Sequence, residues 1–179
     1  MNITGSFQVS SSYQYNPQIM ERIHLLLDRA LTDHAQVLLI RFDVRYPTAY
    51  HASDDNTLFQ QFIENYCRYL RRHEYSPLYL WCRERNTSDN PHYHVVFLLD
   101  GTRIRYMPNL NHANKIFCEL LDLPVPQRGL LHFCNPNGTL VHRGDHDAYE
   151  AALDYVSYLA KTYTKITLPG TRSWSSSLL

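Results

Sequence analysis

Two histidines and a glutamate are the residues of this 179-residue chain best suited to hold a metal ion. His92 and His94 are separated by one residue in an apolar run that predicts a strand, so both imidazoles project from one face. Glu84 lies in the preceding apolar run, and a turn centred near Ser88 would pair it with His92. Two imidazoles and one carboxylate leave coordination positions open, as catalytic metal sites do. The pattern therefore predicts a metal site.

Other interpretations of these three residues remain open from the sequence. The chain contains 10 histidines, so a pair with this spacing also arises by chance. A shift of one residue in the strand register would turn Glu84 to the other face, and Asp43 or Asp89 would then be the substitute ligand. The two histidines would also be unremarkable at the solvated end of a hairpin that binds no ion.

A second candidate constellation is a tyrosine followed three residues later by a lysine. Residues 147–163 have the apolar spacing of a helix, and Tyr158 lies outside the apolar face with Lys161 one turn further on. A free phenol has a pKa near 10, so it needs a nearby cation or a polarised phosphate to act as a nucleophile. Tyr155, on the flank of the same helix, is an alternative nucleophile. An exposed tyrosine beside a solubilising lysine is the simpler interpretation.

Apolar periodicity predicts the elements that position these residues. Helices are expected over residues 17–31, 55–73, 110–122 and 147–163, and strands over 36–45, 78–85, 92–99, 129–134 and 139–143. Helices that return between antiparallel strands imply an α+β domain with a single central antiparallel sheet flanked by helices. This domain is predicted to span residues 17–166, between a polar N-terminal arm (1–16) and an irregular C-terminal tail (167–179).

The composition is that of a globular protein, with 44% hydrophobic and 19% charged residues. The 17 basic residues balance the 17 acidic ones, which argues against a protein that binds polyanions by bulk charge. The four cysteines have no CxxC spacing and lie in apolar stretches, which indicates buried thiols in a reducing compartment. No signal peptide and no apolar run of 18 residues is found, so a cytoplasmic protein without a membrane segment is expected.

The basic residues are unusual because 14 are arginines and three are lysines. Arginine grips phosphate in a planar fork and stacks on bases. Arg68, Arg71 and Arg72 gather at the end of the predicted helix 55–73, where positive charge complements the helix dipole. That role is the simplest interpretation of this cluster.

The motifs, in their order along the chain, resemble the HUH endonuclease superfamily of rolling-circle replication initiators. More narrowly, they resemble the inovirus-type replication proteins, a family that includes the filamentous-phage gene-two-like proteins and the prophage proteins YagK and YfjJ. The resemblance covers most of the chain, from about Val37 to Trp174. It is carried by LLIRFDVRYP (38–47), LWCRERN (80–86), NPHYHVVFLLDG (90–101), SYLAKTYTK (157–165) and LPGTRSW (168–174).

The resemblance implies a ferredoxin- or RRM-like HUH fold and a metal-dependent nickase. Mg²⁺ or Mn²⁺ would be held by Glu84, His92 and His94. Tyr158 would be the nucleophile and Lys161 its helper, with Tyr155 as a second candidate. Such a protein would nick single-stranded or supercoiled origin DNA through a 5′-phosphotyrosine and initiate rolling-circle replication of a phage or prophage element in the bacterial cytoplasm.

Further partners and DNA contacts follow from the same expectation. Host helicase and polymerase are candidate partners. The residues expected to contact DNA are Arg83, Arg85, Lys165 and Arg172.

Two rival interpretations belong to other classes of function. One is a catalytically inactive DNA-binding or regulatory remnant on the same fold, in which Tyr158 has no role. Its phosphate contacts would be Arg83, Arg85, Arg103 and Arg105. The other is a different metal- or histidine-dependent phosphoesterase that uses the same strand, and its histidine-triad members require a third alternating histidine. Position 96 is a valine, so the sequence disfavours this class.

Overall fold

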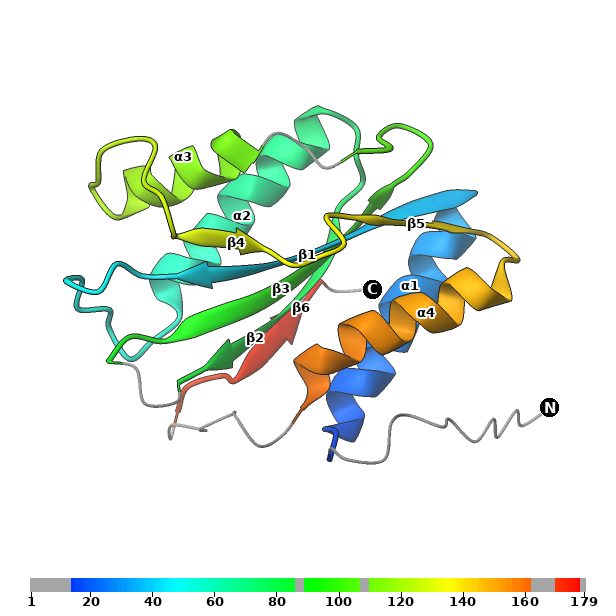
Figure 1. The fold of residues 1–179 in the computed structure, drawn as a ribbon, viewed down its shortest axis with the longest axis horizontal. Coiled ribbons are helices and arrows are strands. Elements are labelled where there is room, and N and C mark those ends of the chain that lie inside the picture. The colour runs from blue at the N-terminus through cyan, green and yellow to red at the C-terminus, as the bar shows by residue number, and fades with distance from the viewer. Residues whose placement is uncertain (1–13, 86–88, 107–109, 162–169, 178–179) are drawn as a thin grey trace.

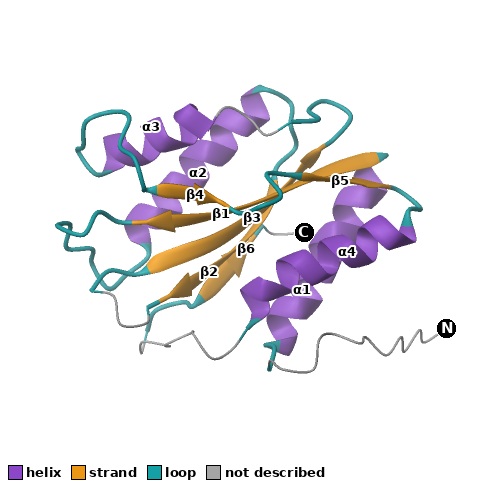
Figure 2. Cartoon of the chain, viewed as in Figure 1, coloured by secondary structure: helices purple, strands orange, loops and turns teal. Residues whose placement is uncertain are grey.

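The computed structural model describes residues 14–85, 89–106, 110–161 and 170–177. Within these residues the chain forms an α+β domain with one antiparallel sheet between helices (Figures 1 and 2), which confirms the predicted fold class. The elements in chain order are α1 (Pro17–Asp33), β1 (Gln36–Arg45), α2 (Thr57–Arg72), β2 (Leu78–Glu84), β3 (His92–Asp100), α3 (Leu110–Leu120), β4 (Leu131–Phe133), β5 (Thr139–His142), α4 (His146–Ser157), the 3₁₀ turn η1 (Tyr158–Ala160) and β6 (Trp174–Ser176).

The sheet is built around β1 and β3, which pair from Val37 opposite Asp100 to Arg45 opposite His92. β2 pairs with the other side of β3, and β6 extends the sheet beyond β2, giving the order β4-β1-β3-β2-β6. β5 shares the outer edge of β1 with β4. β4 pairs with residues 42–44 and β5 with residues 36–39.

Each face of the sheet is covered by two helices, so side chains that alternate along β1 enter two different cores. Leu38 and Ile40 belong to the core under α2 and α3, whereas Val37 and Leu39 belong to the core under α1 and α4. Figure 1 shows the two helix pairs on opposite sides of the sheet. The sheet is therefore buried on both faces over most of its area, and a site on it must lie where one helix layer ends.

The local sequence accounts for most element boundaries. α1 begins at the predicted Pro17, and the side chain of the N-cap Asn16 accepts hydrogen bonds from the backbone N–H groups of Gln18 and Ile19. β1 has the predicted bounds, and β2 and β3 differ from the prediction by one residue each. Three of the four cysteines are buried thiols, as expected, and Cys134 is half-buried.

The predicted irregular tail contains a strand, so that prediction was wrong for Trp174–Ser176. These residues form β6, which pairs antiparallel with Leu80–Cys82 of β2. The Ser-rich segment has no alternating apolar pattern of its own. The outer edge of β2 offers a row of unpaired backbone groups, and a short segment without a strong intrinsic preference is sufficient to pair with it.

The last predicted helix, 147–163, is shorter than expected. α4 ends at Ser157, residues 158–160 form a 3₁₀ turn, and Lys161 is extended with φ −57° and ψ 133°. The cause is a contact distant in sequence. The backbone N–H of Asn16 donates to the carbonyl of Ala160 at 2.7 Å, and Tyr15 forms an antiparallel bridge with Lys161. The end of the predicted N-terminal arm is thus part of the domain; residues 1–13 and 162–169 lie outside the described part.

Candidate active site

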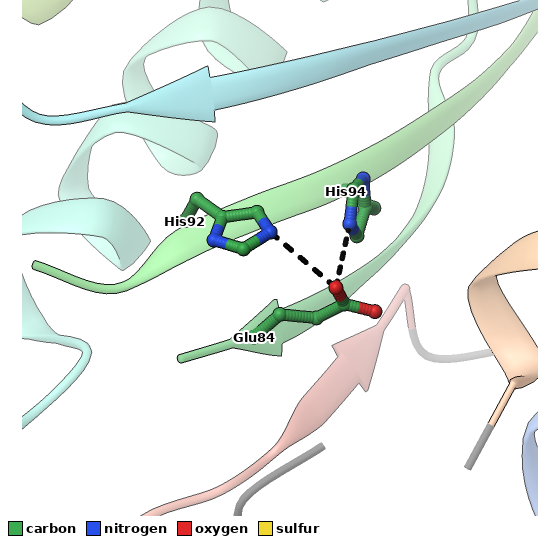
Figure 3. Close-up of side chains that lie close together, drawn as sticks. All are labelled: Glu84, His92 and His94. Carbon is green, nitrogen blue, oxygen red and sulfur yellow. Dashed lines mark ion pairs between the residues drawn. The ribbon is translucent and has the colours of Figure 1, made fainter. Parts of the chain in front are cut away.

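The hairpin of β2 and β3 has the register predicted by a turn centred near Ser88. Glu84 pairs directly with His92, and Cys82 pairs with His94. Because side chains alternate along a strand, Glu84, His92 and His94 share the face that packs against α1 and α4. Figure 3 shows the three side chains pointing toward one another at one end of the two strands.

The three side chains converge closely enough to bind one metal ion. One donor atom from each lies within 4.8 Å of the others. Oε2 of Glu84 is 3.3 Å from Nε2 of His92 and 3.0 Å from Nε2 of His94. Glu84 and His94 are each only 3% exposed, whereas His92 is half-buried. Glu84 and His94 are therefore closed off from solvent, and the cluster is accessible to solvent next to His92.

The contact between His94 and Glu84 fits two ligands that share a cation. Nδ1 of His94 is engaged by Asp43, so in the neutral ring the proton lies on Nδ1 and the lone pair of Nε2 faces Glu84. Nε2 is buried, and Oε2 of Glu84 lies 3.0 Å away from it. A lone pair facing a carboxylate is stable only with a proton or a metal ion between them.

Asp43 is the carboxylate that orients His94, not a substitute metal ligand. β1 pairs Asp43 opposite His94, and its Oδ1 lies 2.5 Å from Nδ1 of the imidazole. Burial disfavours the Asp43 carboxylate, but the hydrogen bond and charge of His94 prevail and lower its pKa. Burial likewise disfavours a charged His94, but the neighbouring Asp43 and Glu84 carboxylates prevail and raise its pKa. This carboxylate–histidine arrangement is the usual support of a metal ligand.

Glu84, His92 and His94 are called the metal-ligand cluster below, as the candidate ligands of one ion. The 3₁₀ turn at the end of α4 places Tyr158 beside this cluster. Its ring centroid is 5.2 Å from that of His94, with the two ring planes at 84°. Two cations lie on the same ring. The guanidinium carbon of Arg41 is 4.1 Å from the Tyr158 centroid, and Nζ of Lys161 is 4.5 Å from it. The two constellations predicted separately from the sequence thus form one site.

Tyr155 occupies a different position from Tyr158. Its hydroxyl donates a hydrogen bond to the carbonyl of Pro136 at 3.2 Å. Burial, together with the nearby Cys134 thiol and Asp43, raises the pKa of Tyr155 to about 12 in spite of Arg41. A phenol with a raised pKa that already donates to a carbonyl is a poor nucleophile. The geometry therefore favours Tyr158 of the two candidates.

Sequence reasoning missed Arg41, which connects the strand to the tyrosines. Its Nη1 donates to the carbonyl of Tyr155 at 3.3 Å, and its guanidinium carbon is 5.4 Å from the Tyr155 ring. Nε of Arg41 is buried and makes no hydrogen bond to any group that the structure describes. The sequence did contain a signal for Arg41. It lies two residues before Asp43 on the same strand, so both side chains project from one face.

The predicted DNA contacts lie in different environments. Arg83 is 2% exposed and projects from the opposite face to Glu84, so its prediction as a DNA contact does not fit its position. Arg85 forms an ion pair with Asp54 and donates to the carbonyl of Asp89 at 2.8 Å. Arg172 is exposed. Lys165 lies outside the described residues.

Comparison with known proteins identifies the family. The model of the YagK/YfjJ C-terminal domain matches residues 6–177, and the chain therefore belongs to this family. No curated protein and no solved structure matches the chain. In the part of the chain that the structure describes, no helix has the length and apolar character needed to cross a membrane.

Proposed function

We propose that this protein is a metal-dependent endonuclease that nicks single-stranded DNA, becomes attached to it through Tyr158, and so initiates rolling-circle replication of a phage or prophage element. The observation that carries the proposal is the contact between Tyr158 and the metal-ligand cluster, with 5.2 Å between the rings of Tyr158 and His94. A nucleophile in contact with a candidate Lewis-acid site is the arrangement that metal-assisted phosphodiester cleavage through a covalent intermediate uses.

In this reaction the phenol oxygen of Tyr158 attacks phosphorus. A phosphorus–oxygen bond to the tyrosine forms, the bond to the 3′ oxygen breaks, the phenol loses its proton and the 3′ oxygen gains one. The products are a 5′-phosphotyrosine and a free 3′ hydroxyl, and the reverse reaction rejoins the strand. A divalent cation, Mg²⁺ or Mn²⁺, held by Glu84, His92 and His94 would polarise the scissile phosphate.

Two cations of the protein support Tyr158 as the nucleophile. Arg41 and Lys161 both lie within 4.5 Å of the ring centroid. Positive charge next to a phenol favours the phenolate, and the same groups are suited to bind the phosphate that is attacked. Arg41 is held by the carbonyl of Tyr155, so its guanidinium is positioned before DNA binds.

The alternative is a DNA-binding or regulatory remnant without catalytic activity. That account gives no role to the contact of Tyr158 with His94 or to the two cations beside the Tyr158 ring. Burial of a carboxylate is costly, and a cation between it and the two imidazoles would offset that cost. The contact of Glu84 with both histidines therefore supports the enzyme over the remnant.

The test uses single-stranded oligonucleotides with a randomised centre, because no origin sequence is assumed. One pool carries fluorescein at the 3′ end and a second at the 5′ end, and each is incubated with protein and Mn²⁺ or Mg²⁺. An SDS-resistant fluorescent protein band is expected only with the 3′ label, because the downstream fragment carries the 5′-phosphotyrosine. EDTA should abolish the band.

Matched tyrosine variants complete this test. Tyr158→Phe should form no adduct, and Tyr155→Phe should retain it within about twofold, because only the former removes the proposed nucleophile. An adduct that survives in Tyr158→Phe, or no adduct with any metal in the wild-type protein, would contradict the proposal.

A further inference from the structure

Three arginines lie on the exposed side of the last turns of α2, away from the candidate active site. Arg68, Arg71 and Arg72 are all exposed, and positions three and four apart on a helix are neighbours on its surface. α2 begins beside the catalytic end of the sheet, where Phe59 stacks on Tyr93 at 3.6 Å. The arginines are a helix length further along, on the opposite face of the sheet from Glu84.

Complementing the helix dipole explains charge at this helix end, but not the shape of the surface. Two hollows flank the helix. One, of about 480 Å³, is bounded by Arg71 and by Tyr79 of β2. The other, of about 450 Å³, is bounded by His112 and Ile116 of α3. Arg68 and Arg72 line both hollows, so they stand on the ridge between them.

The acidic residues around this ridge are largely engaged by other bases. Glu74 pairs with Arg103 at 3.6 Å, and Glu119 pairs with Lys115 at 3.7 Å. Glu64 is the one carboxylate that lines the first hollow. Among the described residues, no carboxylate forms an ion pair with any of the three arginines, and Arg68 donates only to the side chain of Asn65, at 3.0 Å. Among the described residues that line the two hollows, three arginines therefore face one carboxylate, Glu64, that has no other basic partner in an ion pair.

A stack of rings holds the helix end in place. Tyr69 lies between His112, at 3.8 Å, and Tyr66, at 6.1 Å between ring centroids, and His73 packs on its edge at 4.6 Å. A fixed helix end reduces the ordering that binding would require. The planar guanidinium of arginine donates two parallel hydrogen bonds to an oxyanion, and the phosphate groups of a nucleic-acid backbone accept such pairs.

We infer that the Arg68–Arg71–Arg72 ridge binds the phosphate backbone of nucleic acid at a second surface, separate from the site that cuts. The flanking part of the same DNA would lie on this ridge while the strand to be cleaved reaches Tyr158. The inference rests on the proposed function for the identity of the polyanion as DNA. It does not depend on nicking.

Fluorescence anisotropy tests this surface with a fluorescein-labelled duplex of arbitrary sequence and with one of its single strands. The variant Arg68→Gln/Arg71→Gln/Arg72→Gln is compared with a control of equal charge change, Arg22→Gln/Arg29→Gln/Arg128→Gln. We expect the ridge variant to bind at least about tenfold more weakly, and the slope of log affinity against log salt to fall by about 2 to 3. The control should stay within about twofold.

The two probes and two further measurements separate the possible outcomes. A loss on the duplex, on the single strand or on both supports the ridge and identifies the form of DNA bound. Equal affinities of the ridge variant and the control for both probes would overturn the inference. So would displacement of the DNA by poly-L-glutamate as readily as by unlabelled DNA. Anisotropy measures binding and requires no cleavage, so a failure of nicking is distinguishable from a failure of this surface. Equal urea midpoints exclude unfolding of the ridge variant.

Discussion

The two faces of the sheet differ most at the level of Glu84 and His92. Under α2, aromatic rings fill this level, with Phe59 stacked on Tyr93 and packed edge-on against Trp81 at 5.4 Å. On the other face, the apolar contacts of α1 and α4 give way to charged and polar side chains. Neighbouring residues on one strand thus pack the aromatic core on one face and form the candidate metal site on the other, because side chains alternate between the faces.

The largest effect expected from this comparison is on the aromatic face. Phe59→Ala should lower the free energy of unfolding by about 3–5 kcal/mol, because a fully buried ring and its stacking are lost. His92→Ala, on the opposite face and half-buried, should cost no more than about 1 kcal/mol in the metal-free protein. Urea denaturation in EDTA measures both. A larger loss of unfolding free energy in His92→Ala than in Phe59→Ala would contradict the assignment of stability to the aromatic face.

Metal binding should stabilise the folded protein through the ligands on the polar face of the sheet. Mn²⁺ at about 100 times its Kd should raise the free energy of unfolding by about 2.7 kcal/mol. Glu84→Gln should lose this gain because it removes the carboxylate that contacts both histidines. Thermal unfolding with and without Mn²⁺ measures the difference. An unchanged response in Glu84→Gln would show that the ion binds elsewhere.

Asp43 should affect metal binding through its hydrogen bond with His94. Asp43→Asn keeps the shape of the side chain but weakens its hold on Nδ1 of the imidazole, and we expect about 10- to 100-fold weaker Mn²⁺ binding. Asp89→Asn, an exposed carboxylate on the hairpin turn, is the matched control and should bind Mn²⁺ like wild type. Isothermal titration calorimetry with Mn²⁺ distinguishes them. Equal losses in both variants would indicate a general effect of charge.

These positions also show what the sequence was able to predict. The register of Glu84 and His92 followed from turn composition and strand alternation, both local properties. The Tyr158–Lys161 contact followed from spacing. The end of α4, the pairing of β6 and the role of Asp43 all depend on partners distant in the chain, Asn16, β2 and His94. No periodicity within a segment encodes such partners, so these features required the structure.

The smallest expected effect is a difference between the metal-free and the metal-bound protein in how the free energy of unfolding depends on pH. The pKa of His94 is raised above its ordinary 6.5, so its contribution to stability is fully present below pH 6.5 and is lost as the pH rises through the folded-state pKa. The pKa of Asp43 is lowered from 3.8, so its contribution is lost only as the pH falls through the folded-state value. The metal-free protein should therefore lose stability as the pH rises above 6.5.

With Mn²⁺ present the trend should reverse, because the metal competes with a proton for His94. Urea midpoints between about pH 6 and 8, in EDTA and in MnCl₂, measure both slopes. Parallel slopes in the two conditions would contradict the placement of the ion at His94.

The central claim is that Tyr158 and the metal-ligand cluster act on the same phosphate. The most direct test is to isolate the covalent adduct formed with Mn²⁺, trim the DNA with nuclease and sequence the tryptic peptide 144–161 by mass spectrometry. This peptide contains Tyr149, Tyr155 and Tyr158, so fragment ions distinguish them. We expect the nucleotide on Tyr158, and only when Mn²⁺ or Mg²⁺ was present. A nucleotide on Tyr155 or Tyr149, or an adduct that forms equally in EDTA, would contradict the account.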